Sequence, residues 1–207
     1  METNTLTAIA LVCTLRPSPA PSSSEKLARE VLRELERHGV SGDLVRIVDH
    51  DVKPGVTTDE GEGDAWPAIR DRVLAADVLV LATPTWMGHP SSVAQRVLER
   101  LDAELSETDA SGRPTMFGTV GIVAVVGNED GAHAIVADVE QALNDVGVTI
   151  PAQGSTYWNG EAMAKTDYLD LPATPESTAS ATATAARNAA HLAGLLKSDP
   201  YPAPAGA

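Results

Sequence analysis

Residues 14–24 carry an arginine, three consecutive serines and three prolines directly before a helical pattern. Hydroxyl groups, the free amides at a helix N-terminus and the charge of Arg16 together bind a phosphate group well. The segment is therefore typical of a monophosphate site. A second interpretation has equal weight, in which the serines only cap the helix and the prolines only stiffen a surface loop.

Residues 84–91 follow an apolar run and contain Trp86, Met87 and Gly88. A flat aromatic side chain, a polarizable one and a glycine that permits close backbone approach suit the walls of a site for a planar heteroaromatic ring. Packing of Trp86 against a neighbouring subunit is the alternative. Residues 127–133 then offer glycine amides and small polar groups for the polar edge of such a ring, although an ordinary strand-to-helix turn has the same composition.

Several other kinds of site leave no pattern in this sequence. It contains neither the G-x-x-x-x-G-K-[ST] of a nucleoside triphosphate loop nor the G-x-G-x-x-G of a dinucleotide fold. It has no G-x-S-x-G nucleophile elbow, so a hydrolase using Ser22, or His133 with Asp130, ranks last. The histidines lack metal-ligand spacing, and the single cysteine, Cys13, excludes an internal disulfide. We expect no metal and no catalytic side chain.

The chain is strongly acidic, with a formal net charge of −14. Nucleic acids require a basic face on their partner, so they are excluded. No apolar run approaches the roughly 20 residues that cross a membrane, and the longest run near the start is too short for a signal peptide. Together with the single cysteine, these features predict a cytoplasmic protein that does not bind membranes.

Apolar runs of strand length alternate with helical patterns along the chain. This alternation predicts a doubly wound parallel α/β sheet with helices on both faces. In such a sheet the loops after the strands lie at one edge, which brings residues 14–24, 84–91 and 127–133 together. The predicted strands are 6–13, 43–49, 77–82, 118–127 and 147–151, and the predicted helices are 23–38, 66–74, 91–104, 135–146 and 177–197.

The length suits one domain, which we place at residues 1–197. Residues 198–207 contain three prolines and are predicted to be a flexible tail. Residues 153–175 show no clear periodicity, but they carry Tyr157, Trp158 and Tyr168 in a chain with few aromatic residues.

The order and spacing of the three loops resemble the flavodoxin-like NAD(P)H-dependent FMN reductase and quinone oxidoreductase family. The resemblance rests on the hydroxyl-rich loop at 14–24, a P-T-x-x-x-x-x-S-S loop at 84–92 and a G-N-x-x-G loop at 127–131. It implies a five-stranded parallel sheet in the order 2-1-3-4-5. By position it implies FMN phosphate contacts from Thr14, Arg16, Ser22, Ser23 and Ser24, isoalloxazine contacts from Pro84, Thr85, Trp86, Met87 and Gly88, and contacts to the pyrimidine side from Gly127, Asn128, Glu129 and Gly131.

The same resemblance implies an FMN-dependent oxidoreductase. Hydride would pass from NAD(P)H through flavin N5 to a quinone, a flavin or another small acceptor, while Trp86 and Tyr157 or Trp158 shape the substrate side. The alternative is a flavodoxin-type electron carrier that binds FMN without oxidising NAD(P)H itself, which the acidic charge also suits. The resemblance further implies a homodimer or homotetramer.

The sequence departs from the family pattern in three places. The family commonly has a compact G-S-x-R-x-x-S loop, whereas residues 17–21 separate Arg16 from the serines here. A tyrosine is usual where Trp86 stands. Residues 153–170 are longer than the family pattern, which suggests a lid or a subunit contact.

Overall fold

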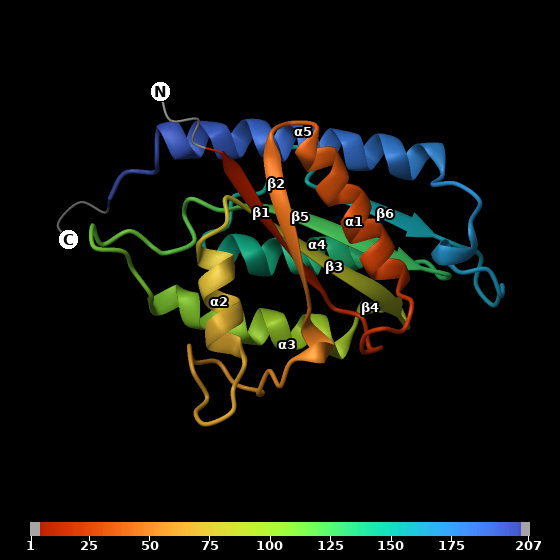
Figure 1. Cartoon of the computed structure of the whole chain (residues 1–207), viewed down its shortest axis with the longest axis horizontal. Helices are drawn as coiled ribbons and strands as arrows, with labels where there is room; N and C mark the ends of the chain where they lie inside the picture. The colour runs from red at the N-terminus through yellow and green to blue at the C-terminus, as the bar shows by residue number, and fades with distance from the viewer. Residues whose placement is uncertain (1–4, 204–207) are drawn as a thin grey trace.

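The computed structural model describes residues 5–203, and a twisted parallel sheet forms its centre (Figure 1). The strands lie in the order β2-β1-β3-β5-β6, and each neighbouring pair is parallel. A short strand, β4 (His89–Pro90), pairs antiparallel with the end of β3. The parallel strands are β1 (Leu6–Val12), β2 (Val40–Arg46), β3 (Val78–Trp86), β5 (Val120–Gly127) and β6 (Ser155–Asn159).

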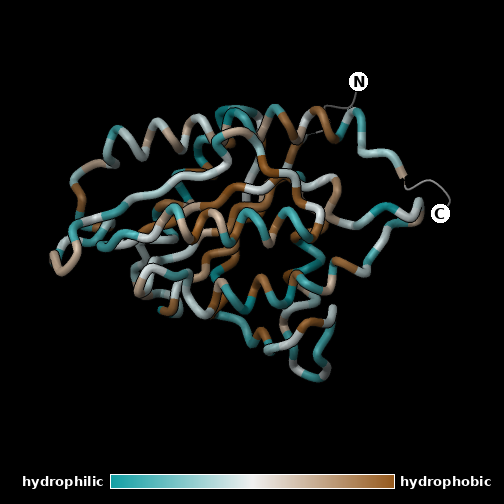
Figure 2. Tube along the Cα trace, turned by 180° about the vertical axis from the view of Figure 1, so that it is seen from behind, coloured by the Kyte–Doolittle hydropathy of each residue, from teal (hydrophilic) through white to brown (hydrophobic). Residues whose placement is uncertain are grey.

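Helices cover both faces of this sheet. One apolar core cluster joins the sheet to α1 (Ser23–Glu36) and α5 (Glu176–Ser198). The other joins the opposite face to α2 (Trp66–Leu74), α3 (Ser92–Leu101) and α4 (Ala132–Asp145). Seen from behind in Figure 2, the hydrophobic segments accordingly concentrate in the central strands. The predicted doubly wound α/β fold is confirmed.

The central strands form because their side chains find apolar partners on both sides. Residues 78–82 at the start of β3 are fully buried, and β5 is buried along nearly its whole length. Branched apolar residues fit such a pleated, two-sided environment well. The sequence periods of α1 and α3 likewise match their buried faces, because Leu27, Val31 and Leu35 of α1 are all inaccessible.

One expectation about the sheet was wrong. The predicted fifth strand at 147–151 makes only an isolated bridge between Val120 and Thr149, and β6 pairs with β5 instead. Pro151 has no N–H for the ladder, so the chain leaves the sheet there and rejoins it after Gly154, whose carbonyl accepts from Val123. Counted in chain order without the two-residue β4, the five parallel strands lie in the expected order 2-1-3-4-5; the labels β5 and β6 arise because β4 enters the count.

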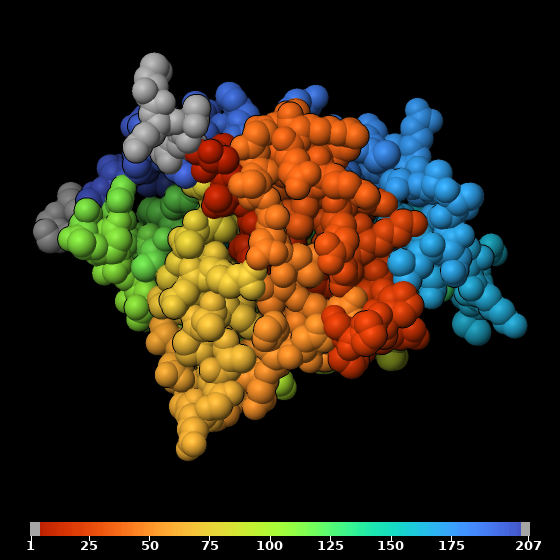
Figure 3. All heavy atoms as spheres, in the orientation of Figure 1, coloured from red at the N-terminus to blue at the C-terminus, as the bar shows by residue number. Residues whose placement is uncertain are grey.

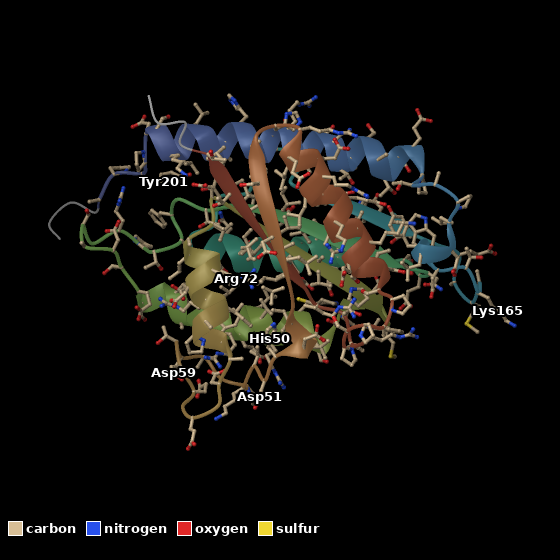
Figure 4. All side chains as sticks on the ribbon, in the orientation of Figure 1. His50, Asp51, Asp59, Arg72, Lys165 and Tyr201 are labelled. Carbon is tan, nitrogen blue, oxygen red and sulfur yellow. The ribbon has the colours of Figure 1, made fainter. Side chains whose placement is uncertain are left out.

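Part of the predicted flexible tail at 198–207 contacts the rest of the protein. Tyr201, labelled in Figure 4, lies against the body of the protein: its ring contacts Phe117 edge-on at 5.4 Å between centroids, and its hydroxyl lies 3.1 Å from Thr149 Oγ1. Residues 204–207 lie outside the described residues. Within residues 5–203, none of the helices combines the length and apolar character needed to cross a bilayer.

Candidate functional site

A cavity of about 720 Å³ opens at the carboxyl ends of β1, β3 and β5. The three loops predicted to meet at one edge of the sheet all contribute to it. Of the candidates from the sequence, the residues that line it are Thr14, Arg16, Ser22, Ser23, Ser24, Pro84, Thr85, Trp86, Gly127, Asn128 and Glu129.

The first loop leads directly into α1. Ser22 caps this helix, because its Oγ accepts a hydrogen bond from the N–H of Glu25 at 3.2 Å. The amides of Ser23 and Ser24 at the start of the helix have no acceptor within α1. The capping interpretation of the serines is thus correct for Ser22, and it leaves the neighbouring amides free to face an anion.

Arg46 at the end of β2 and Asp49 in the 3-10 turn that follows it (Ile47–Asp49) hold the proline-rich loop in place. The buried guanidinium of Arg46 donates from Nη1 to the carbonyls of Arg16 (3.2 Å) and Ala20 (2.8 Å). Asp49 accepts the N–H of Ser18 at 2.7 Å and its hydroxyl at 2.6 Å. These hydrogen bonds lower the pKa of Asp49. The loop is therefore tied to the sheet although its prolines exclude regular structure.

Arg46 also forms an ion pair with Glu25 in the first turn of α1, and its Nε donates to Oε2 at 2.9 Å. Burial alone would raise the pKa of Glu25, but hydrogen bonds from Arg46 and Arg29 outweigh burial and lower it. The carboxylate therefore stays charged and connects α1 to β2. Sequence reasoning did not identify Arg46 or Asp49 as residues that organise this site.

The second and third loops contact each other across the cavity edge. The N–H of Met87 donates to Glu129 Oε1 at 2.7 Å. A Cβ at Gly131, which has φ of +125°, would lie 2.8 Å from the Cα of Gly88, so the two backbones touch. Met87, Gly88 and Gly131 accordingly join the loops to each other but do not line the cavity.

Ser91 connects the second loop to the first. Its hydroxyl donates to the carbonyl of Cys13 at 2.6 Å and also caps α3 by accepting the N–H of Ala94. The N–H of Ser91 donates to Thr83 Oγ1 at 3.1 Å. The ends of β1 and β3 are thus held in register at the cavity floor.

Trp86 supplies an accessible aromatic wall, because 55% of its surface is exposed. Next to it, Thr85 is buried, and its Oγ1 has no hydrogen-bond partner among the described residues. A Cβ at Gly127 would lie 2.6 Å from the Cβ of Thr85, so a larger residue at position 127 would clash with Thr85. His89 is exposed beside Trp86 but does not line the cavity.

The far wall comes from residues 158–169, which the sequence suggested as a lid or a subunit contact, with Trp158 as a candidate for the substrate side. Trp158, Met163, Asp167, Tyr168 and Leu169 line the cavity. Asn128 Nδ2 of the third loop donates to Asp167 Oδ1 at 3.0 Å. Figure 4 shows Lys165 at the outer tip of this segment, pointing away from the body of the protein.

Tyr168 fixes this segment to α1. Its ring is buried and lies 5.5 Å from the ring of Trp158, and its hydroxyl donates to Glu30 Oε2 at 2.5 Å. Burial and the nearby Glu30 raise the pKa of Tyr168. Lys26 Nζ donates to the carbonyl of Tyr168 at 2.9 Å and lies 4.7 Å from its ring centre. Tyr157, the other aromatic candidate, packs instead on His133 and the α4 side.

Phosphate-type donors at one end of the cavity, aromatic walls and a parallel sheet edge are typical of α/β proteins that bind mononucleotides. The chain belongs to the NADPH-dependent FMN reductase family, whose model matches residues 6–162. A solved structure of RosB with the bound intermediate 8-demethyl-8-formylriboflavin-5'-phosphate is similar, with a TM-score of 0.85 and 28% identity. The matched region covers 95% of this chain and 82% of the RosB chain. The NADH:FMN oxidoreductase EmoB shares the fold, with a TM-score of 0.66 and 17% identity. The matched region covers 95% of this chain and 92% of the EmoB chain.

Two curated relatives also match in sequence. The 8-demethyl-8-aminoriboflavin-5'-phosphate synthase of Streptomyces davaonensis is 28% identical over 206 residues, covering 95% of this chain and 80% of that protein. A protein of Mycobacterium bovis named divalent metal cation transporter MntH is 40% identical over 169 residues, or 80% of this chain. This chain spans only 25% of the length of that transporter.

The residues around the cavity fit a flavin mononucleotide. Free amides at the start of α1 and the guanidinium of Arg16 suit the phosphate. Trp86 and Trp158 offer flat walls for a tricyclic ring, and Gly127 and Asn128 of the third loop offer polar partners for the ring edge. The cavity volume lies within the range of about 300–1,000 Å³ that is usual for small-molecule sites.

Proposed function

We propose that this cavity binds FMN and that the protein is an oxidoreductase that uses NAD(P)H to reduce a quinone, a flavin or another small acceptor. The observation that carries the proposal is the convergence of a phosphate-binding helix start, aromatic walls and a polar loop on one cavity. When bound, FMN would supply the hydride chemistry through its N5.

The residues of the cavity would bind FMN and orient it toward NAD(P)H. We assign the phosphate to Thr14, Arg16 and the start of α1, the ring face to Pro84, Thr85 and Trp86, and the ring edge to the third loop. The wall at 158–169 would exclude water from the ring, since its residues line the same cavity as Trp86. None of these assignments requires a side chain that acts as an acid or a base.

Purified protein provides a direct test. We expect a yellow protein that releases FMN on heating and oxidises NADH or NADPH in stopped-flow measurements. A protein that binds FMN but is reduced only through a separate reductase would be a flavodoxin-type carrier, the alternative function. A protein without affinity for any flavin would refute both functions.

The likeness to the Streptomyces davaonensis synthase and to RosB supports a second candidate, in which riboflavin 5'-phosphate is a substrate. Both names describe flavin phosphates altered at position 8. Mass spectrometry of the flavin after turnover separates the two functions, because a reductase returns FMN with its mass unchanged.

We also propose a homodimer or homotetramer. Leu15, Trp86 and Met163 at the cavity, with Met87 beside it, are large apolar side chains exposed in one chain, which a second subunit would cover. Light scattering on the purified protein measures this directly, and a monomeric mass at micromolar concentration would contradict it.

A further inference from the structure

A second cavity, of about 330 Å³, adjoins the phosphate end of the proposed FMN site. We call it the basic groove. Pro21, Ser22 and Leu169 line both cavities, so the groove continues the first cavity past the start of α1. In Figure 3 the light-blue atoms of the segment near residue 169 border the red-orange atoms at the start of α1.

Four cationic side chains line the basic groove, namely Lys26, Arg29, Arg33 and Arg46. Glu25 is the only carboxylate in its lining, and Arg29 and Arg46 both pair with it. The groove therefore carries a local positive charge in a chain whose net charge is −14. Such a concentration of cations on a strongly acidic protein favours an anionic ligand.

Several of these cations keep donors free. Lys26 Nζ uses one donor for the carbonyl of Tyr168, and Arg29 directs Nε and Nη2 at Glu25. Nη2 of Arg33 lies 3.9 Å from Oε1 of Glu30, which is too far for a hydrogen bond. The Arg33 side chain is 66% exposed. Glu30 itself accepts hydrogen bonds from Tyr168 and Thr174. Arg33 is thus the cation least committed to a partner within the chain.

The position of the groove indicates which anion fits it. A ligand that begins in the flavin cavity and passes the start of α1 carries its first phosphate at that helix and a second one beside Lys26 and Arg29. Pro19 and Pro21 form a stiff apolar wall on the other side of the groove. A pyrophosphate followed by a nucleoside matches this sequence of charged and apolar surfaces.

We propose that the basic groove binds the AMP half of FAD, so that the chain takes the flavin dinucleotide as well as FMN. This inference rests on the proposed flavin site. It goes further than that proposal because it assigns a ligand to Lys26, Arg29 and Arg33 of α1. None of these three side chains lines the FMN cavity.

Two charge reversals on the same helix test the proposal. Arg33→Glu places a negative charge in the groove, and Arg37→Glu makes the same change one turn later, outside the groove, where the side chain is 72% exposed and pairs with Glu34. Flavin-free protein is titrated with FMN and with FAD, and binding is followed by flavin fluorescence. Melting curves show whether both variants fold.

We expect the unmodified protein to bind FAD at least as tightly as FMN. Arg33→Glu should weaken FAD binding about tenfold and change FMN binding less than about twofold, because the reversed charge lies in the basic groove and not in the FMN cavity. Arg37→Glu should leave both affinities unchanged. FAD affinity should also fall more steeply with salt than FMN affinity.

Other results overturn the inference. If FMN binds but FAD binds more than about tenfold weaker, the groove does not accept AMP, and the proposed function stands without it. If Arg33→Glu raises the KM for NADPH while FAD affinity is unchanged, the groove serves the nicotinamide nucleotide instead. If neither flavin binds, the proposed function fails and this inference fails with it.

Discussion

Arg46 is the buried cation that holds the proline-rich loop, and we expect Arg46→Met to weaken both folding and FMN binding. The side chain is 7% exposed, and that of its partner Glu25 is 19% exposed. Removing one partner of a buried ion pair costs about 3–5 kcal/mol. Arg29 still contacts Glu25 at 2.8 Å, so we expect the lower end of that range, about 3 kcal/mol.

Urea unfolding followed by circular dichroism measures the stability term, and titration with FMN measures binding. The carbonyls of Arg16 and Ala20 lose their shared donor in this variant, so the loop loosens. We expect FMN affinity to fall about tenfold, because binding must then order the loop. Arg72→Met is the matched control: Arg72 lies on α2, far from the segment marked by Lys165 in Figure 4, and its pair with Asp43 is exposed.

The control should cost less than about 1 kcal/mol, as exposed ion pairs do. An equally small loss for Arg46→Met would show that the buried pair does not hold the loop. A full loss of stability with unchanged FMN affinity would show that the loop does not position the phosphate donors. The double variant Glu25→Gln with Arg46→Met should be more stable than the sum of the single effects predicts, since the two side chains share one contact.

Three further predictions concern the exposed ring of Trp86, the buried hydroxyl of Thr85 and the buried carboxylate of Asp64. Trp86→Ala should weaken FMN binding about tenfold, measured by calorimetry, and destabilise less than Trp66→Ala, which removes a fully buried ring at a cost of about 3–5 kcal/mol. Thr85→Val should stabilise the flavin-free protein by about 1 kcal/mol in thermal melts, because it removes a buried hydroxyl that has no partner; a lower melting temperature would contradict this. Burial alone would raise the pKa of Asp64, but the backbone N–H groups of Lys53, Glu60 and Trp66 and the guanidinium of Arg100 lower it from 3.8 to about 2. Its contribution to stability is therefore complete above about pH 4 and is lost as the pH falls toward 2, a dependence that Asp64→Asn should flatten in urea unfolding between pH 2 and 5.

The sequence was sufficient to predict the central strands and the helices beside them. Strands such as β3 are continuous apolar runs, because parallel strands are buried on both faces. β6 was missed for the opposite reason: Ser155–Asn159 is an edge strand of polar and aromatic residues, and only Thr156 in it is buried. We placed the fifth strand at 147–151 because that run is more apolar. Hydrophobic periodicity does not account for Pro151, which lacks the N–H needed for strand pairing.

The three loops of the candidate site were also predictable, because sheet topology alone places them at one edge. The residues that hold these loops were not. Asp49 contacts Ser18 across 31 positions of sequence, and Tyr168 contacts Glu30 across 138. No local spacing encodes such contacts, which arise only when β2 and α1 are packed. The cluster of aromatic residues after position 156 was the one signal that pointed to the far wall.

The contact between Gly88 and Gly131 limits how this site can diverge. A side chain at Gly131 meets backbone atoms of Gly88, and backbone cannot move aside as a flexible side chain can. The ring wall formed by the second and third loops is therefore closed to substitution at that point. Residues 161–166 have few such contacts and are mostly exposed. Under the proposed function, new acceptor preferences can therefore arise by changes in that outer segment, while the proposed flavin end of the cavity keeps one shape.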